Sequence, residues 1–141
     1  MRIPDVNILL YASDTASSHH AAARRWVESA LSATETVGFG IVVLLGFIRI
    51  ATNPQVMAAP LAFSEAFDQV EEWLAQSPAA VLHPGPRHLV VWRELIEVAG
   101  TAGNLTTDAH LAALAIEHGA TLASFDGDFH RFGGLKLEYL N

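Results

Sequence analysis

The fold of this protein is decided by residues 109–128, which read AHLAALAIEHGATLASFDGD. Leucine and alanine recur at helical spacing in the first half, and Gly119 is suited to end the helix because glycine adopts the left-handed conformation without penalty. The apolar segment 120–125 then predicts a buried strand, followed by the polar turn Asp126-Gly127-Asp128. A helix, a glycine and a buried strand in this order indicate an α/β protein.

The rest of the chain continues this alternation. We expect a first strand that ends near Asp5 and turns into a short helix. Further helices are predicted at residues 19–31, 41–51, 64–74 (with Ser64 as its cap) and 87–99 (ended by Gly100 and Gly103). Short strands are predicted at residues 80–82 and 135–140. Strands that alternate with helices predict a three-layer α/β/α sandwich with a central, mainly parallel sheet.

Length and composition limit the architecture and the class of protein. A chain of 141 residues, 51% of them hydrophobic, is expected to form one domain over residues 1–141. Cysteine is absent, which excludes disulfides, thiol nucleophiles and cysteine-based zinc sites. The most apolar stretch, residues 37–48, is too short to span a bilayer and is interpreted as buried core. The start of the chain does not resemble a signal peptide, so we expect a cytoplasmic protein without a membrane partner.

The net charge is −7 with the histidines neutral. A protein that coats nucleic acid without sequence preference would carry an excess of Lys and Arg. The charge therefore argues against that class, but it does not exclude an enzyme that acts on nucleic acid with the help of divalent metal ions. Glycine motifs for dinucleotides (GxGxxG) and for P-loops are absent, as is the GxSxG motif of serine hydrolases.

Four acidic residues stand at the edges of predicted strands and helices: Asp5, Asp108, Asp126 and Asp128. In parallel sheets, sites form outside the carboxyl ends of the strands, where we expect Asp5 and Asp126. Carboxylates gathered there repel one another unless a cation lies between them. Oxygen ligands without cysteine favour Mg²⁺ or Mn²⁺ over zinc.

Each of these aspartates also has a structural interpretation. Asp5 can cap the helix that follows it, and Asp126 with Asp128 can form a simple turn. Asp108 follows Thr106 and Thr107, either of which can cap a helix whose dipole favours an anion at that place. Only their joint placement favours a site. The histidines lack the HExxH spacing of zinc enzymes and are expected to be structural or exposed.

Three blocks of the sequence resemble the PIN domain, and more closely the VapC-type ribonuclease toxins of toxin–antitoxin pairs. They are residues 5–12 (DVNILLYA), residues 105–115 (LTTDAHLAALA) and residues 119–129 (GATLASFDGDF). Residues 44–54 (LLGFIRIATNP) also resemble a subgroup of these toxins. The blocks stand in the expected order and cover essentially the whole chain.

The resemblance implies a PIN-like sandwich that hydrolyses RNA phosphodiester bonds with Mg²⁺ or Mn²⁺ held in an acidic pocket. Asp5, Asp108 and Asp126 match the metal-binding and catalytic aspartates, and Asp128 matches a supporting acid. Asn7 and either Thr106 or Thr107 match polar residues that orient the carboxylates. Apart from the resemblance, Arg49 and Arg131 are the better candidates for contact with a substrate phosphate, because they follow segments expected near the site. The implied partners are the RNA, a cognate antitoxin and a second copy of the chain.

Two other functions are compatible with these residues. One is a catalytically weak PIN-like protein that binds RNA or titrates an antitoxin without cleaving. The other is a metal-dependent phosphatase that acts on small substrates. The first alternative draws on a departure from the family pattern, since the usual glutamate after the second apolar segment corresponds here to Gly46.

Restoring that glutamate provides a test of the alignment. Replacement of Gly46 by Glu is expected to raise the affinity for Mn²⁺, because it adds a carboxylate to the proposed ligands. Titration of the purified variant with Mn²⁺ measures this, and unchanged binding by a folded Gly46→Glu protein would contradict the alignment.

Overall fold

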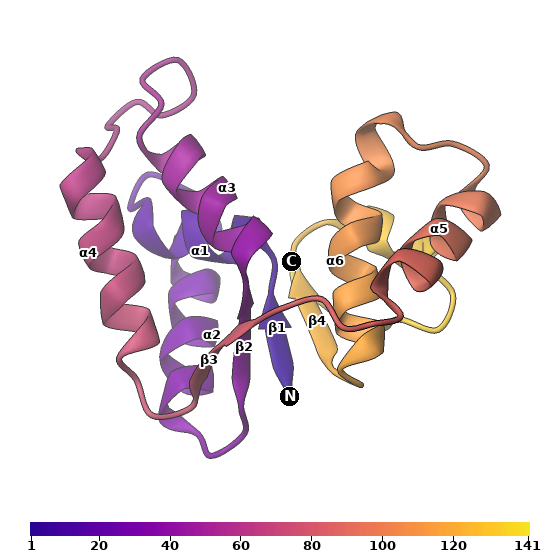
Figure 1. Ribbon diagram of the computed structural model, residues 1–141. Coiled ribbons are helices and arrows are strands. Elements are labelled where there is room, and N and C mark those ends of the chain that lie inside the picture. Colours follow the sequence, from indigo (N-terminus) through magenta and orange to yellow (C-terminus); the bar gives the residue numbers. More distant parts are fainter.

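The computed structural model describes residues 1–141 and contains a five-stranded sheet in the order β3-β2-β1-β4-β5 (Figure 1). All neighbouring strands are parallel, so the predicted sheet is parallel throughout. The strands are β1 (Arg2–Pro4), β2 (Val37–Gly40), β3 (Ala79–Leu82), β4 (Thr121–Ser124) and β5 (Lys136–Tyr139). The first strand of the chain thus lies at the centre, between strands from the two halves of the sequence.

Helices cover the sheet on both faces, which confirms the predicted three-layer sandwich (Figure 1). They are α1 (Val6–Ser13), α2 (His20–Ser32), α3 (Ile41–Ala51), α4 (Phe63–Leu74), α5 (His88–Ala99) and α6 (Thr106–Glu117), with short 3₁₀ turns η1 (Gly103–Leu105) and η2 (Gly127–Arg131). None of the helices is long and apolar enough to cross a membrane.

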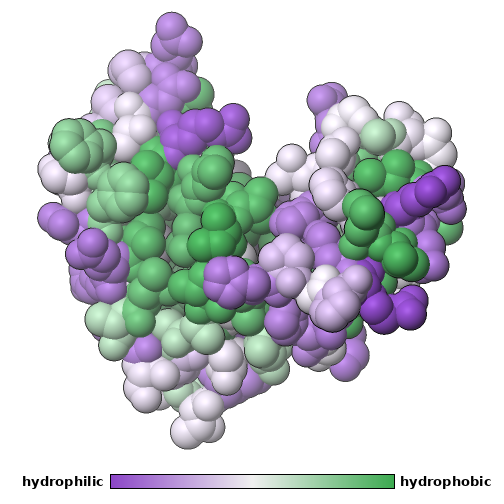
Figure 2. Space-filling view, viewed as in Figure 1, coloured by the Kyte–Doolittle hydropathy of each residue, from purple (hydrophilic) through white to green (hydrophobic).

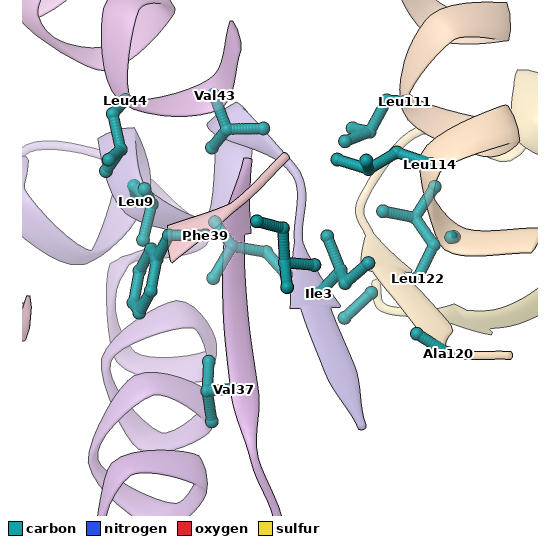
Figure 3. Close-up of a cluster of buried hydrophobic side chains, with 14 of the residues drawn as sticks. Ile3, Leu9, Val37, Phe39, Val43, Leu44, Leu111, Leu114, Ala120 and Leu122 are labelled. Carbon is teal, nitrogen blue, oxygen red and sulfur yellow. The ribbon is translucent and has the colours of Figure 1, made fainter. Parts of the chain in front are cut away.

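The hydrophobic core lies on both sides of the central strands. Figure 3 shows Leu9 of α1 and Phe39 of β2 on one side, and Leu111 and Leu114 of α6 on the other. All four side chains are at most 3% exposed. Burial of apolar surface on both faces is what a parallel sheet requires, and it explains why β2 is buried at every position rather than at alternate ones.

The second strand, β2, was not predicted as a strand. The apolar stretch at residues 37–48 predicts buried core without a strand, but the chain changes from strand to helix at Gly40 and Ile41. All four residues of β2 are buried, so hydrophobic alternation is absent, and a short apolar run of this kind cannot be distinguished from a buried helix by its periodicity. The helix that follows, α3, has the predicted bounds.

Glycines end two of the helices as predicted, whereas two of the residues predicted to cap helix starts do not cap them. Gly100 and Gly119 have φ of 77° and 61°, so the glycines predicted to end α5 and α6 do adopt the left-handed conformation. The capping residues predicted for the start of α4 and α6 were wrong. Instead of Ser64 capping α4, the side chain of Glu65 accepts a 2.9 Å hydrogen bond from the backbone N–H of Ala62.

At α6 the helix begins three residues earlier than predicted, at Thr106. Its first residues follow η1 directly, and no side chain caps its N-terminus. Neither threonine is therefore a cap. The preceding 3₁₀ turn forms backbone hydrogen bonds at the point where the sequence pattern predicts a capping side chain.

Gly38 provides a test of the packing between β2 and β3. A Cβ atom at this position would lie 2.4 Å from Cδ1 of Leu82, whose side chain is buried. Replacement of Gly38 by Ala is therefore expected to lower the free energy of unfolding by about 1–3 kcal/mol, as overpacked cores do. Denaturant unfolding measures this. With Leu82→Ala in the same chain, the combined loss should be smaller than the sum of the single losses, and strict additivity would contradict the proposed contact.

Candidate active site

The parallel pairing of β1 with β4 brings Asp5 next to Ser124. Pro4 pairs with Ala123, and the backbone N–H of Asp5 donates a 2.9 Å hydrogen bond to the carbonyl oxygen of Ala123. The residues that follow both strands therefore leave the sheet at the same edge. This is the carboxyl edge at which sites form in parallel sheets.

The hydroxyl group of Ser124 joins three polar groups at this edge. It donates a 2.7 Å hydrogen bond to Oδ2 of Asp5, and it accepts hydrogen bonds from Nδ2 of Asn7 (3.2 Å) and from the backbone N–H of Asp126 (2.9 Å). A serine hydroxyl has one proton and two lone pairs, so all of its hydrogen-bonding capacity is used. Ser124 is fully buried, which makes this network rigid.

Asp5 is a buried carboxylate at the start of α1. Its Oδ1 accepts a 2.7 Å hydrogen bond from the N–H of Val6, so the predicted capping role is present. Burial nevertheless raises the pKa of Asp5, and the charge of Asp126 raises it further, whereas the hydrogen bonds from Ser124 and Val6 oppose the increase. The ionised form of Asp5 is therefore costly unless positive charge lies nearby.

The other three aspartates converge on the same place. Burial raises the pKa of Asp108 from 3.8 to about 6, and the negative charges of Asp5, Asp126 and Asp128 contribute to the increase. Asp126 follows β4, and its Oδ1 accepts a 2.9 Å hydrogen bond from the N–H of Asp128. Residues more than one hundred positions apart thus share one electrostatic environment at the carboxyl edge.

The predicted supporting residues differ in the contacts that they make. Asn7 donates to Ser124 and accepts a 3.3 Å hydrogen bond from the N–H of Phe125, so it acts on Asp5 through Ser124. Arg131 is near enough to Asp108 for its charge to lower that pKa. Arg49 is exposed in the last turn of α3.

No hydrogen bond joins the side chain of Thr106 or Thr107 to a carboxylate in this structure. Both line a mainly apolar cavity of about 410 Å³ between α3, α5 and α6. The carbonyl oxygen of Thr106 accepts a 3.0 Å hydrogen bond from Nε1 of Trp92, which ties the start of α6 to α5. The backbone of Thr106 therefore helps to position the helix that carries Asp108, and a role of either threonine in orienting a carboxylate stays a prediction.

Ser124 is the residue of this site that sequence reasoning missed. It ends β4 and lies inside the segment 120–125 that was predicted to be a buried strand, where it is a polar residue with no water to hydrate it. Buried hydroxyl groups need hydrogen-bond partners, so its position was a usable signal. The identity of those partners depends on the pairing of β1 with β4, which the sequence does not specify.

The donor chemistry of the site suits a hard divalent cation. All four acidic groups are carboxylates, and their mutual repulsion is visible in the raised pKa values of Asp5 and Asp108. In the conformation described, no three His, Asp or Glu side chains are close enough to surround one ion. Oδ2 of Asp5 accepts a hydrogen bond from Ser124 and Oδ1 accepts one from Val6, and each oxygen keeps a further lone pair for a cation.

Gly46 faces the start of α1. A Cβ atom at this position would lie 3.3 Å from Cγ2 of Val6, the residue after Asp5. The position matched to the family glutamate is therefore adjacent to the acidic site, although a side chain there requires a small movement of Val6. The effect of a glutamate at residue 46 on Mn²⁺ affinity stays a prediction.

Residues 2–135 match the PIN domain. A parallel sheet with carboxylates gathered at its carboxyl edge is the arrangement that the resemblance implies, and the match spans nearly the whole chain. The protein belongs to the PIN-domain family.

Curated relatives narrow the comparison within this family. The chain is 45% identical over 138 residues to Ribonuclease VapC37 of Mycobacterium tuberculosis, a match that covers 98% of this chain and 96% of the relative. It is 44% identical over 136 residues to Ribonuclease VapC33 of the same organism, covering 96% and 95%.

Solved structures with low sequence identity share the fold. VapBC2 from Rickettsia felis, bound to a DNA fragment from its promoter, has a chain that matches with a TM-score of 0.72 at 19% identity, covering 99% of this chain and 98% of that one. VapC20 of Mycobacterium tuberculosis, described as a toxin that cleaves the sarcin–ricin loop, matches with a TM-score of 0.69 at 17% identity, covering 96% and 99%. The sandwich is thus the same along its full length.

Replacement of Asp108 by Asn is expected to stabilise the metal-free protein above pH 6. The pKa of Asp108 is about 6 in the folded protein and 3.8 without the fold, so its ionised form destabilises the fold fully above pH 6. The penalty shrinks as the pH falls between these values and is absent below the lower one. Because the group is half-buried, the gain is on the order of 1 kcal/mol.

Denaturant unfolding in EDTA at about pH 8 and about pH 5 measures this effect. The stability difference between the two proteins should be larger at the higher pH. A difference that is equal at both pH values, or a variant that is less stable at about pH 8, would contradict the proposed repulsion.

Proposed function

We propose that this protein is a metal-dependent endoribonuclease and the toxin of a VapBC-type toxin–antitoxin pair. The observation that carries the proposal is the convergence of four carboxylates at the carboxyl edge of the sheet, where the charges of Asp5, Asp126 and Asp128 raise the pKa of Asp108. High identity to proteins named as VapC ribonucleases, over nearly the full length of both chains, supports RNA as the substrate.

In this proposal Asp5, Asp108 and Asp126 hold Mg²⁺ or Mn²⁺, and Asp128 supports them. When bound, the ion would lower the pKa of a water molecule and offset the negative charge that develops on the phosphate. Asn7 and Ser124 keep the Asp5 carboxylate in a fixed orientation through the hydrogen bonds described above. Arg131, on the exposed turn after β4, is placed to contact a substrate phosphate, and Arg49 is a second candidate.

A protein antitoxin is the proposed partner. Several structural neighbours were solved as VapBC complexes, which supports a partner of this type. The concentration of negative charge at the site favours a cationic partner segment, and an arginine placed against the aspartates would block metal and substrate together.

A second copy of the chain is also proposed as a partner. Figure 2 shows hydrophobic side chains gathered over the sheet and α3, with another group over α5. Ile41 and Leu45 of α3 are 50% and 57% exposed, and Leu89 of α5 is 72% exposed. Apolar surface of this kind supports a self-association face.

One observation favours the alternative of a binding protein without cleavage. Gly46 supplies no carboxylate at the position of the family glutamate, and no three acidic or histidine side chains surround a common point in the conformation described. The alternative predicts binding of RNA or antitoxin with no metal-dependent product.

Incubation of antitoxin-free protein with a total-RNA pool tests the proposed function. In Mg²⁺ or Mn²⁺ we expect discrete fragments, and in EDTA we expect none. Replacement of Asp108 by Asn should reduce the cleavage rate by about 10²–10⁴-fold, because a group that holds the metal and its charge is lost. Gel or sequencing analysis of the fragments gives the rate and the cleavage site.

The matched control is Asp68→Asn, which changes an exposed aspartate on α4 outside the acidic cluster. It should cleave like the unaltered protein. Absence of cleavage with either metal, by a folded protein free of inhibitor, would favour the binding alternative.

A further inference from the structure

Three aromatic rings from separate elements meet beside the acidic site. Tyr11 of α1 and His19, just before α2, have ring centroids 5.2 Å apart, and Phe125 after β4 lies 5.3 Å from Tyr11 and 4.7 Å from His19. Each ring therefore contacts the other two. None of the aspartate interactions described above uses these rings.

The cluster adjoins the carboxylates directly. Phe125 stands between Ser124 and Asp126, and its backbone N–H donates to the side chain of Asn7. Tyr11 follows Asn7 by four residues on α1, so it lies on the same face of that helix, one turn or about 5.4 Å farther along. Because Phe125 directly precedes Asp126, a base next to a phosphate held at the aspartates lies within reach of this cluster.

The rings differ from the aromatic residues of the core. Phe39 and Phe47 are at most 1% exposed, whereas Tyr11, His19 and Phe125 are all partly exposed. Their backbones are nevertheless anchored, since the carbonyl oxygen of Tyr11 is 2.9 Å from Nδ1 of His20 and Phe125 is bound to Asn7. The cluster is thus a preorganised aromatic surface that is partly open to solvent.

An aromatic surface offers a way to bind RNA that does not depend on net positive charge, which this protein lacks. With a net charge of −7 and a carboxylate cluster at the site, attraction to phosphates contributes little to capture. Stacking of a base on an aromatic or imidazole ring does not depend on charge and tolerates any base sequence. It requires a base whose face is free, as in single strands and loops.

We propose that Tyr11, His19 and Phe125 form a stacking platform for an unpaired RNA base next to the scissile phosphate. This inference rests on the proposed action on RNA, and it adds to it a base-binding subsite built from residues of three separate elements. It assigns the three rings to binding, with no part in the chemical step.

The experiment measures binding, so that cleavage is not needed. A fluorescent single-stranded RNA decamer of random sequence is titrated with the protein in EDTA, beside an abasic decamer with the same backbone and a blunt duplex of the same length. The unaltered protein should bind the base-bearing strand roughly 5–150-fold more tightly than the abasic strand, the effect of one base–aromatic stack. It should also prefer that strand to the duplex.

Two substitutions in the platform should remove this preference. His19→Ala removes a ring, and Phe125→Leu keeps apolar packing but loses the aromatic face. Both should weaken binding of the base-bearing strand and leave binding of the abasic strand unchanged. His19→Tyr, which restores a ring, should recover the preference, and thermal unfolding checks that each variant is folded.

The matched control is His118→Ala, a change to an exposed histidine just after α6, at the end of that helix opposite Asp108. It should keep the preference of the unaltered protein. Equal affinity of the unaltered protein for base-bearing and abasic strands would overturn the platform, as would equal losses on both strands in the variants. The cleavage assay decides the proposed nuclease function separately, because it needs metal and this titration does not.

Discussion

The hydrogen bond between the Ser124 hydroxyl and the Asp5 carboxylate is the contact on which the site depends. It links the residue that ends β4 to the residue that follows β1, in a place where neither side chain meets water. A buried carboxylate without such a partner would be protonated or would destabilise the fold. Because the same hydroxyl also accepts from Nδ2 of Asn7 and from the backbone N–H of Asp126, one buried group joins the residues that follow β1 to those that follow β4.

The cluster that results is electrostatically unfavourable by itself. Four carboxylates share one edge of the sheet, and the raised pKa of Asp108 reflects both its burial and the repulsion. Folding tolerates this because the hydrophobic core beneath, with α6 packed on the central strands, supplies the stabilisation. Electrostatic repulsion of this kind, concentrated where several elements end, is typical of functional sites. A bound cation would relieve it.

Much of the architecture was predictable from local pattern. The alternation of helices and strands, the bounds of α3 and the glycine ends of α5 and α6 follow from hydrophobic periodicity and backbone preference. The strand β2 was missed because a fully buried strand has no alternation, and the caps were wrong because backbone and glutamate contacts replaced the expected hydroxyl groups. Local signals fail where tertiary contacts supply the missing partner.

The sequence by itself determined the class of fold and the identity of the acidic residues. It could do so because periodicity and residue chemistry are local properties. Only the tertiary structure decided that Asp5 and Asp126 share one buried hydroxyl, that Thr106 lies beside an apolar cavity, and that rings from three elements meet beside the aspartates. Some of these contacts join residues more than one hundred positions apart. They are set by the register of parallel strands, which no local pattern encodes.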